Sequence, residues 1–176
     1  MHRSGLRVTG LALMAHARFA SSFTPVTVAG SVPCFVDGPV GAPAVIVIQE
    51  WWGVNDNVKA LASTIAEKGG FRVLIPDIYK GAIGVDKEEA SHMMGNLDFP
   101  GAVQEISQAA AYLKEEGSPS VGVTGFCMGG ALTLGSLAAS PDIACGAPFC
   151  AFSSLLRMAS YRSISHRRFY LFRRWR

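Results

Sequence analysis

The stretch that decides the fold is Gly125-Phe126-Cys127-Met128-Gly129-Gly130. An apolar, β-branched run over residues 120–124 precedes it, and a run of small and apolar residues over 131–139 follows it. The first run is typical of a buried strand and the second of a helix, so the cysteine stands at a sharp turn between them. Glycine on both sides has a steric reason, because a β-carbon at Gly125 or Gly129 would collide with the neighbouring strand or helix. The pattern is a nucleophile elbow, G-x-S-x-G, with cysteine in place of serine.

Strand and helix patterns alternate on both sides of this turn. Residues 23–42 contain short β-type pieces between prolines and glycines, which suit an edge hairpin or an irregular entry. The predicted strands are 44–48, 71–75, 120–124 and 143–149, and the predicted helices are 55–69, capped by Asn55 or Asn57, 86–96, 98–116 and 127–139. Such alternation predicts βαβ units and an α/β fold with a doubly wound, mostly parallel sheet.

Charge divides the 176 residues into three segments. Residues 1–36 hold three Arg and no acidic residue, residues 37–150 hold six Lys and Arg against all thirteen acidic residues, and residues 151–176 hold seven Arg and no acidic residue. We therefore predict a basic leader or disordered extension over 1–22, a single partial α/β domain over 23–150, and an Arg- and aromatic-rich tail over 151–176.

The leader and the tail each allow more than one interpretation. Residues 1–22 contain Arg and Ser and no acid, which is typical of an organelle transit peptide, and an unstructured extension is the alternative. A cytoplasmic or mitochondrial location follows, and secretion is disfavoured. The tail over 151–176 fits a non-homologous end from alternative splicing or a frameshift better than an arm for nucleic acid or anionic membranes. No apolar run reaches the ~18–20 residues that a membrane helix requires.

The four cysteines are expected to be free thiols. Their positions, Cys34, Cys127, Cys145 and Cys150, include no C-x-x-C pair that would indicate a metal site. A chain with a substantial apolar core does not need a disulfide framework.

The elbow and the end of strand 44–48 carry the chemistry. Cys127 begins a helix, where the helix dipole favours a thiolate, and the N–H of Met128 can bind an oxyanion. The N–H of Trp51 is the candidate second donor, and the Glu50 carboxylate, at the same edge of the sheet, can hold or deprotonate the thiol. The plainer alternatives are a small buried Cys127 without a catalytic role and a solvated carboxylate at Glu50.

Three motifs in this order resemble the dienelactone hydrolase (carboxymethylenebutenolidase) family. They are Gln49-Glu50-Trp51-Trp52-Gly53-Val54-Asn55, Pro76-Asp77-Ile78-Tyr79 and Gly125-Phe126-Cys127-Met128-Gly129-Gly130, and the similarity covers roughly residues 25–150. The resemblance implies an α/β-hydrolase fold and a Cys–His–Asp triad that hydrolyses a small enol-lactone or related ester through an acyl-enzyme. It also implies that Glu50 pairs with the nucleophile, that the Trp51 and Met128 amides form the oxyanion hole, and that no cofactor or metal is needed.

The triad acid and histidine have no convincing counterpart after the elbow. Asp142 precedes its strand and so belongs to the wrong end of the sheet, and His166 stands in the Arg-rich tail. His92 is expected on the surface of a short helix. We therefore expect a chain that lacks the last strands and helices of the family fold and has impaired activity. The alternatives are a non-catalytic isoform with an interaction role and, less favoured, a basic-tailed binder of nucleic acid or membranes. The sequence leaves the choice between a monomer and an oligomer open.

Overall fold

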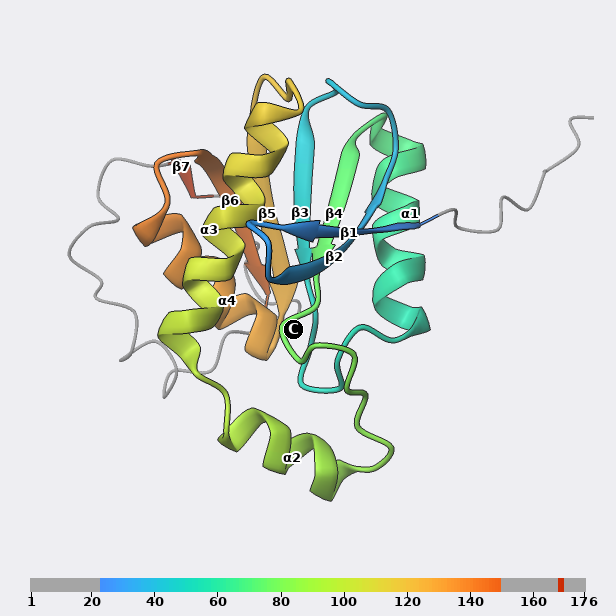
Figure 1. The fold of residues 1–176 in the computed structure, drawn as a ribbon, viewed down its shortest axis with the longest axis vertical. Coiled ribbons are helices and arrows are strands. Elements are labelled where there is room, and N and C mark those ends of the chain that lie inside the picture. The colour runs from blue at the N-terminus through green and yellow to red at the C-terminus, as the bar shows by residue number, and fades with distance from the viewer. Residues whose placement is uncertain (1–22, 150–167, 170–176) are drawn as a thin grey trace, which may run out of the picture.

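A seven-stranded mixed sheet organises the residues that the computed structural model describes, which are 23–149 and 168–169 (Figure 1). The strands are β1 (Thr24–Val28), β2 (Val32–Asp37), β3 (Ala44–Ile48), β4 (Arg72–Pro76), β5 (Val121–Phe126), β6 (Ile143–Phe149) and β7 (Arg168–Phe169). The helices are α1 (Asp56–Gly69), α2 (Lys87–Gly95), α3 (Phe99–Glu115) and α4 (Met128–Ala139). The predicted α/β class is confirmed.

The strands lie in the order β1-β2-β4-β3-β5-β6-β7. β1 pairs antiparallel with β2 and β2 antiparallel with β4, which is the expected entry hairpin at one edge. The remaining pairs are parallel. The chain runs from β3 to β4 on one side and then returns to β5 on the other side of β3. The loops that follow β3 and β5 therefore diverge at the carboxyl edge, which is where α/β sheets bind their ligands.

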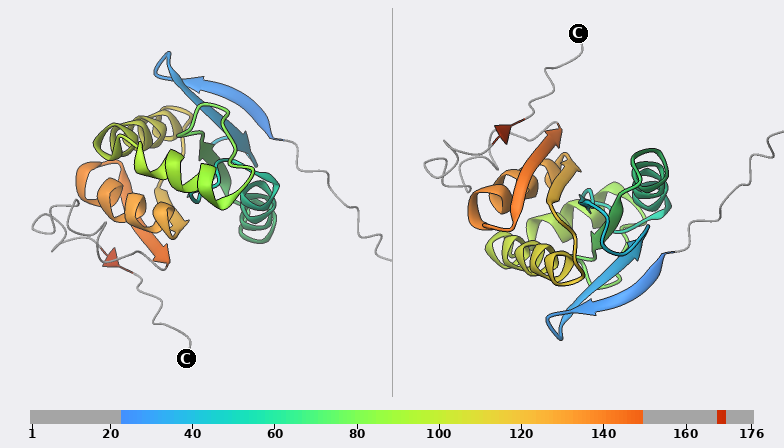
Figure 2. Two further views of the ribbon diagram at one scale, coloured as in Figure 1. Left: turned by 90° about the horizontal axis from the view of Figure 1, so that it is seen from below. Right: turned by 90° about the horizontal axis from the view of Figure 1, so that it is seen from above.

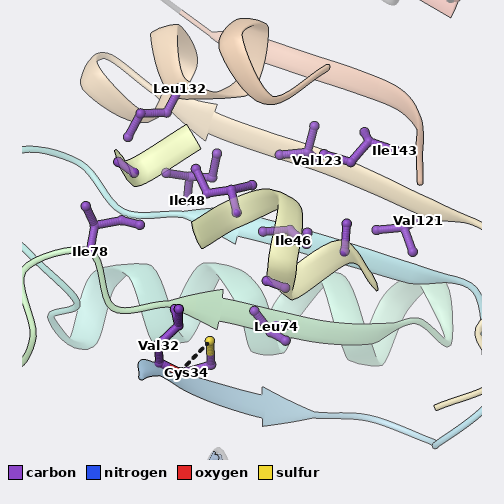
Figure 3. Packing of buried hydrophobic residues seen from close by; sticks show 14 of the residues in the cluster. Val32, Cys34, Ile46, Ile48, Leu74, Ile78, Val121, Val123, Leu132 and Ile143 are labelled. Carbon is purple, nitrogen blue, oxygen red and sulfur yellow. Dashed lines mark hydrogen bonds between the residues drawn. The ribbon is translucent and has the colours of Figure 1, made fainter. Parts of the chain in front are cut away.

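Helices cover the sheet in two layers (Figure 2). α1 packs on one face over β3 and β4, and its buried side chains share a core with Val47, Val73 and Ile75. α3 and α4 lie on the opposite face and bury the larger core, in which Ile46 and Leu74 are fully enclosed (Figure 3). Near-continuous burial explains why β3 is apolar throughout and why β4 is apolar from Val73 onward, after Arg72 at its start.

The helix boundaries follow the caps that the sequence offers. Asn55 caps α1 by accepting a hydrogen bond from the Val58 N–H at 3.2 Å. At the other end Gly70 caps the helix, and its φ of 63° is the left-handed conformation that glycine adopts freely. Asp86 and Asp98 cap α2 and α3 in the same way. The helix predictions are confirmed to within one residue at these ends.

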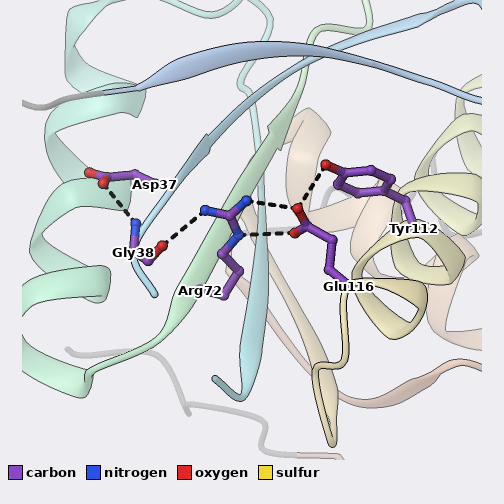
Figure 4. A network of polar contacts seen from close by, with 5 residues as sticks. All are labelled: Asp37, Gly38, Arg72, Tyr112 and Glu116. Atoms are coloured by element: carbon purple, nitrogen blue, oxygen red, sulfur yellow. Dashed lines mark hydrogen bonds and ion pairs between the residues drawn. The ribbon is translucent and has the colours of Figure 1, made fainter. Parts of the chain in front are cut away.

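An ion pair secures the amino edge of the sheet (Figure 4). Arg72, the first residue of β4, donates from Nε and Nη2 to the two carboxylate oxygens of Glu116, each at 3.0 Å. Its Nη1 donates to the Gly38 carbonyl oxygen at 2.9 Å, and the Tyr112 hydroxyl donates to Glu116 at 2.8 Å. Both charged side chains are largely buried, with 10% and 18% exposed. The network joins β4, the end of α3 and the loop after β2.

Several predictions fall on residues that the structure does not describe. The leader over 1–22, Cys150, His166 and almost all of the tail over 151–176 lie outside the described residues, so the interpretations attached to them stay predictions. The exception is β7, whose two residues pair with β6 and which the sequence did not lead us to expect. No helix in the described part of the chain is long and apolar enough to cross a membrane.

Candidate active site

The backbone at Cys127 is strained. Its φ of 54° and ψ of −115° lie outside the regions that L-residues ordinarily occupy, and it stands between the last residue of β5 and the first residue of α4. Such a conformation costs about 1–3 kcal/mol and persists only where the surrounding structure enforces it. Two backbone hydrogen bonds do so here, from the Cys127 N–H to the Phe149 oxygen at 3.0 Å and from the Ala131 N–H to the Cys127 oxygen at 3.2 Å.

Glycines pack the turn against its neighbours. A β-carbon on Gly125 would lie 2.5 Å from the Gly129 carbonyl oxygen, and one on Gly129 would lie 2.7 Å from the Gln49 carbonyl oxygen. A β-carbon on Gly130 would lie 2.5 Å from the oxygen of Phe149. The elbow therefore sits against the ends of both β3 and β6, and these close approaches need residues without side chains.

The first turn of α4 presents free donors next to Cys127. No side chain caps this helix, and helix geometry leaves the N–H of Met128 without an intrahelical partner. The Cys127 side chain is partly exposed, whereas Met128 is buried with 1% of its surface exposed. An anionic oxygen bound beside Cys127 would meet a donor and the positive end of a helix dipole.

The loop after β3 carries Glu50 and Trp51 to the same edge. Glu50 is partly exposed, and its carbonyl oxygen accepts a hydrogen bond from the Gly53 N–H at 3.2 Å, which closes a tight turn around two tryptophans. Trp51 packs against the larger core. Its ring lies edge-on to that of Trp52, with 5.1 Å between the ring centroids.

A small cavity joins this loop to the elbow. Its volume is about 170 Å³, and its lining includes Glu50 and Phe126, the residue that precedes Cys127. Ile48, Val58 and Leu61 make the rest of its wall apolar, with Asn57 at the α1 side. The first and third sequence motifs thus meet at one hollow.

The second motif is bound to the first through a buried amide and to the third through a tyrosine hydroxyl. Gln49 is fully buried, and its Oε1 accepts a hydrogen bond from the Ile78 N–H at 3.1 Å. Asp77 has 5% of its surface exposed, and burial raises the pKa of its carboxyl above the ordinary value of 3.8. The Tyr79 hydroxyl donates to the Met128 sulfur at 3.1 Å. The loops after β3, β4 and β5 therefore form one connected unit.

Asp142 and His92, which were considered as triad members, lie where the sequence predicts them. Asp142 precedes the first residue of β6, at the amino edge, whereas Cys127 follows β5 at the carboxyl edge. His92 is exposed on α2, with its Nε2 3.0 Å from the Asn96 side-chain nitrogen. His166 lies outside the described residues. Asp142 therefore lies at the opposite end of the sheet from Cys127.

Sequence reasoning assigned no role to Gln49 or to Tyr79. Both stand inside motifs that were recognised as patterns, but their partners, Ile78 and Met128, lie 29 and 49 positions away along the chain. The one local signal is that Gln49 places an amide directly after an apolar strand. A polar residue at that position is buried and so must find a partner.

A mostly parallel sheet with a strained nucleophile-type residue between strand and helix defines the α/β-hydrolase class. The family model described as the dienelactone hydrolase family matches residues 32–163. The chain therefore belongs to the dienelactone hydrolase family.

Individual relatives agree with this assignment. The chain is 35% identical over 112 residues to protein Usf of Aquifex pyrophilus, which covers 58% of this chain and 48% of the relative. It is 30% identical over 101 residues to a carboxymethylenebutenolidase of Rhodococcus opacus, which covers 56% and 39%. The chain thus spans less than half the length of these two relatives.

A solved structure supports the fold. A dienelactone hydrolase-like promiscuous phosphotriesterase from metagenomic libraries superposes with a TM-score of 0.58 at 24% identity, over 72% of this chain and 57% of that one. At this level of identity the likeness concerns the fold alone.

Proposed function

We propose that this protein hydrolyses small esters or lactones through a thioester on Cys127. The observation that carries the proposal is the left-handed backbone of Cys127 at the junction of β5 and α4. Residues with strained backbones are found most often at functional sites. At a turn between strand and helix this conformation exposes the side chain of the nucleophile. A cysteine that merely filled space would need neither the strain nor the glycines that permit it.

The proposed reaction has two stages. The sulfur of Cys127 attacks the carbonyl carbon and its proton passes to the Glu50 carboxylate, giving a tetrahedral oxyanion. The carbon–oxygen bond then breaks, the proton returns to the departing alkoxide or enolate, and a thioester remains. Water attacks the thioester, releasing the carboxylic acid and restoring the thiol. In a lactone the departing oxygen belongs to the same molecule, so a single product leaves.

Two backbone amides are proposed to hold the oxyanion. The Met128 N–H has no partner within α4, and the Trp51 N–H belongs to the turn that follows β3. A β-carbon added to Gly129 would lie 2.7 Å from the Gln49 carbonyl oxygen, so the end of β3, where that turn begins, lies close to the start of α4. One such donor is worth about 10²–10³ in kcat in a well-studied protease, so the pair would account for much of the acceleration.

Small substrates suit the space beside Glu50. The cavity of about 170 Å³ has an apolar wall and one carboxylate, so it would take a compact and largely uncharged group. Relatives named as carboxymethylenebutenolidases support an enol-lactone as the natural substrate class. His92 is exposed on α2 and Asp142 lies at the amino edge, so the second stage is proposed to be slow.

Covalent trapping tests the proposal. The protein is mixed with p-nitrophenyl acetate, p-nitrophenolate release is followed by absorbance, and the protein is quenched and mapped by mass spectrometry. We expect a burst that approaches one equivalent and an acetyl group on Cys127, followed by slow turnover. Cys127→Ala should abolish the burst, whereas Cys145→Ala, at a partly exposed thiol on β6, should keep it. Acetylation spread equally over Cys127 and Cys145, or none at Cys127, would refute a nucleophilic role for Cys127.

A further inference from the structure

Tyr79 stands in a loop whose backbone is held on both sides. The Lys80 N–H donates to the Asp77 oxygen at 3.1 Å, and the Ala82 N–H donates to the Tyr79 oxygen at 3.1 Å. Lys80 itself has a φ of 54°, which a non-glycine residue adopts only where the surrounding structure imposes it. The Ile78 N–H is bound by the buried Gln49 amide. The ring of Tyr79 therefore projects from a fixed support.

The hydroxyl of Tyr79 reaches the first residue of α4. It donates to the Met128 sulfur at 3.1 Å, and Met128 is almost completely buried. Methionine is unbranched, has three rotatable bonds and readily changes shape, so a hydrogen bond at its sulfur restrains the whole side chain. Burial raises the pKa of Tyr79 to about 12, so the phenol keeps its proton and remains a donor at any ordinary pH.

The peptide between Cys127 and Met128 is thereby restrained from two directions. The Cys127 carbonyl oxygen accepts the Ala131 N–H at 3.2 Å, which fixes the peptide from the helix side. The side chain of Met128, held by Tyr79, fixes it from the side of the sheet. The N–H of this same peptide is the proposed donor to the oxyanion, and donors of this kind act by being already aligned.

We propose that Tyr79 is a positioning residue for the oxyanion donor. Through its hydrogen bond to Met128 it holds the Met128 N–H in the direction that an oxyanion on Cys127-bound substrate requires. This inference rests on the proposed function of Cys127. It assigns Tyr79 no contact with substrate and no proton transfer.

Two reactions of Cys127 distinguish a loss of oxyanion-donor positioning from a general disturbance of the site. Acylation by p-nitrophenyl acetate forms a tetrahedral oxyanion and so needs the Met128 N–H. Alkylation by iodoacetamide displaces iodide at a saturated carbon and forms no oxyanion, so it reports only whether the thiol is accessible and reactive. Both rate constants are measured on the full chain, with modification of Cys127 followed by peptide mapping.

Tyr79→Phe removes only the hydroxyl. We expect the acylation rate constant to fall by about three- to tenfold, as the loss of one hydrogen bond implies, while the alkylation rate constant changes by less than about twofold. Tyr112→Phe is the matched control, because it removes a hydroxyl that is bound to Glu116 at 2.8 Å at the carboxyl end of α3, away from Met128 in the amino-edge network. It should leave both rate constants unchanged.

A double-mutant cycle tests the contact itself. Met128→Leu keeps the apolar volume but removes the sulfur, so adding Tyr79→Phe to it should lower acylation no further. Additive effects of the two changes, an equal fall in alkylation and acylation, or unchanged acylation in Tyr79→Phe would each overturn the role of Tyr79. If Cys127 in the unaltered chain is alkylated but never acylated, the proposed function fails, and the role of Tyr79 fails with it. Acylation that is normal in Tyr79→Phe leaves the proposed function standing and refutes only the positioning role.

Discussion

A β-carbon on Gly125 would lie 2.5 Å from the carbonyl oxygen of Gly129, because the chain doubles back over a single residue at the elbow. The obstacle is backbone, so it cannot move aside as the end of a flexible side chain can. The close packing of the strand, the turn and the helix therefore requires a residue without a β-carbon at position 125.

Gly125→Ala should consequently destabilise the protein. We expect the free energy of unfolding in urea to fall by about 2–3 kcal/mol, since either the strand or the start of α4 must shift. Gly95→Ala, at the last residue of α2, is the control, because a β-carbon there meets nothing within 4 Å. An alanine at position 125 that costs no more than the one at position 95 would contradict the packing described for the elbow.

Breaking the ion pair between Arg72 and Glu116 is expected to lower the free energy of unfolding more than breaking an exposed pair. Glu116→Ala leaves the largely buried guanidinium without its charged partner, so the free energy of unfolding should fall by about 2–4 kcal/mol. Lys80→Gln breaks the pair with Glu105, in which the lysine side chain is 44% exposed, and should cost less than about 1 kcal/mol. Equal losses in the two variants, measured by the same denaturation, would argue against the buried network.

Thiol reactivity should distinguish the described cysteines. Burial raises the pKa of Cys34 to about 12, and 1% of its surface is exposed, so it should resist iodoacetamide at pH 8 in the folded protein. Cys127 and Cys145 are partly exposed and should react. Peptide mapping before and after unfolding in urea gives the comparison, and Cys34 should react only after unfolding. Labelling of Cys34 as fast as Cys145 in the native state would be inconsistent with its position in the core.

Stability should depend on pH through Asp77. Its pKa is raised by burial, so the folded state binds the proton more tightly than the unfolded state does. The resulting stabilisation is complete below the ordinary value of 3.8 and is lost as pH rises through the raised pKa. The side chain of Asp77→Asn cannot ionise. We therefore expect the difference in free energy of unfolding between this variant and the unaltered chain to be constant below about pH 4 and to shift in favour of the variant as pH rises above that. A constant offset over the whole range would show that Asp77 does not titrate differently on folding.

Local patterns sufficed to predict the helices, the parallel strands β3, β4, β5 and β6, and the elbow. The boundaries at Asn55, Asp86 and Asp98 depend on residues within one turn of each helix, and such information lies in adjacent positions. The glycines of the elbow reveal a close backbone approach for the same reason.

Contacts between distant positions escaped prediction. Arg72 and Glu116 are 44 positions apart, and each alone resembles an ordinary surface residue. The bonds from Gln49 to Ile78 and from Tyr79 to Met128 depend on how β3, β4 and β5 lie side by side, which no single segment contains. β7 was missed because two residues carry no strand periodicity.

The Arg72–Glu116 ion pair lies at the amino edge, at the opposite end of β4 from Tyr79 and at the opposite end of the sheet from Cys127. Residues that secure the fold are thus separate from residues proposed to act on substrate. Substitutions in the loops at the carboxyl edge leave this network intact, so those loops can vary at little cost to the scaffold. The arrangement gives such a fold room to acquire new specificities one loop at a time.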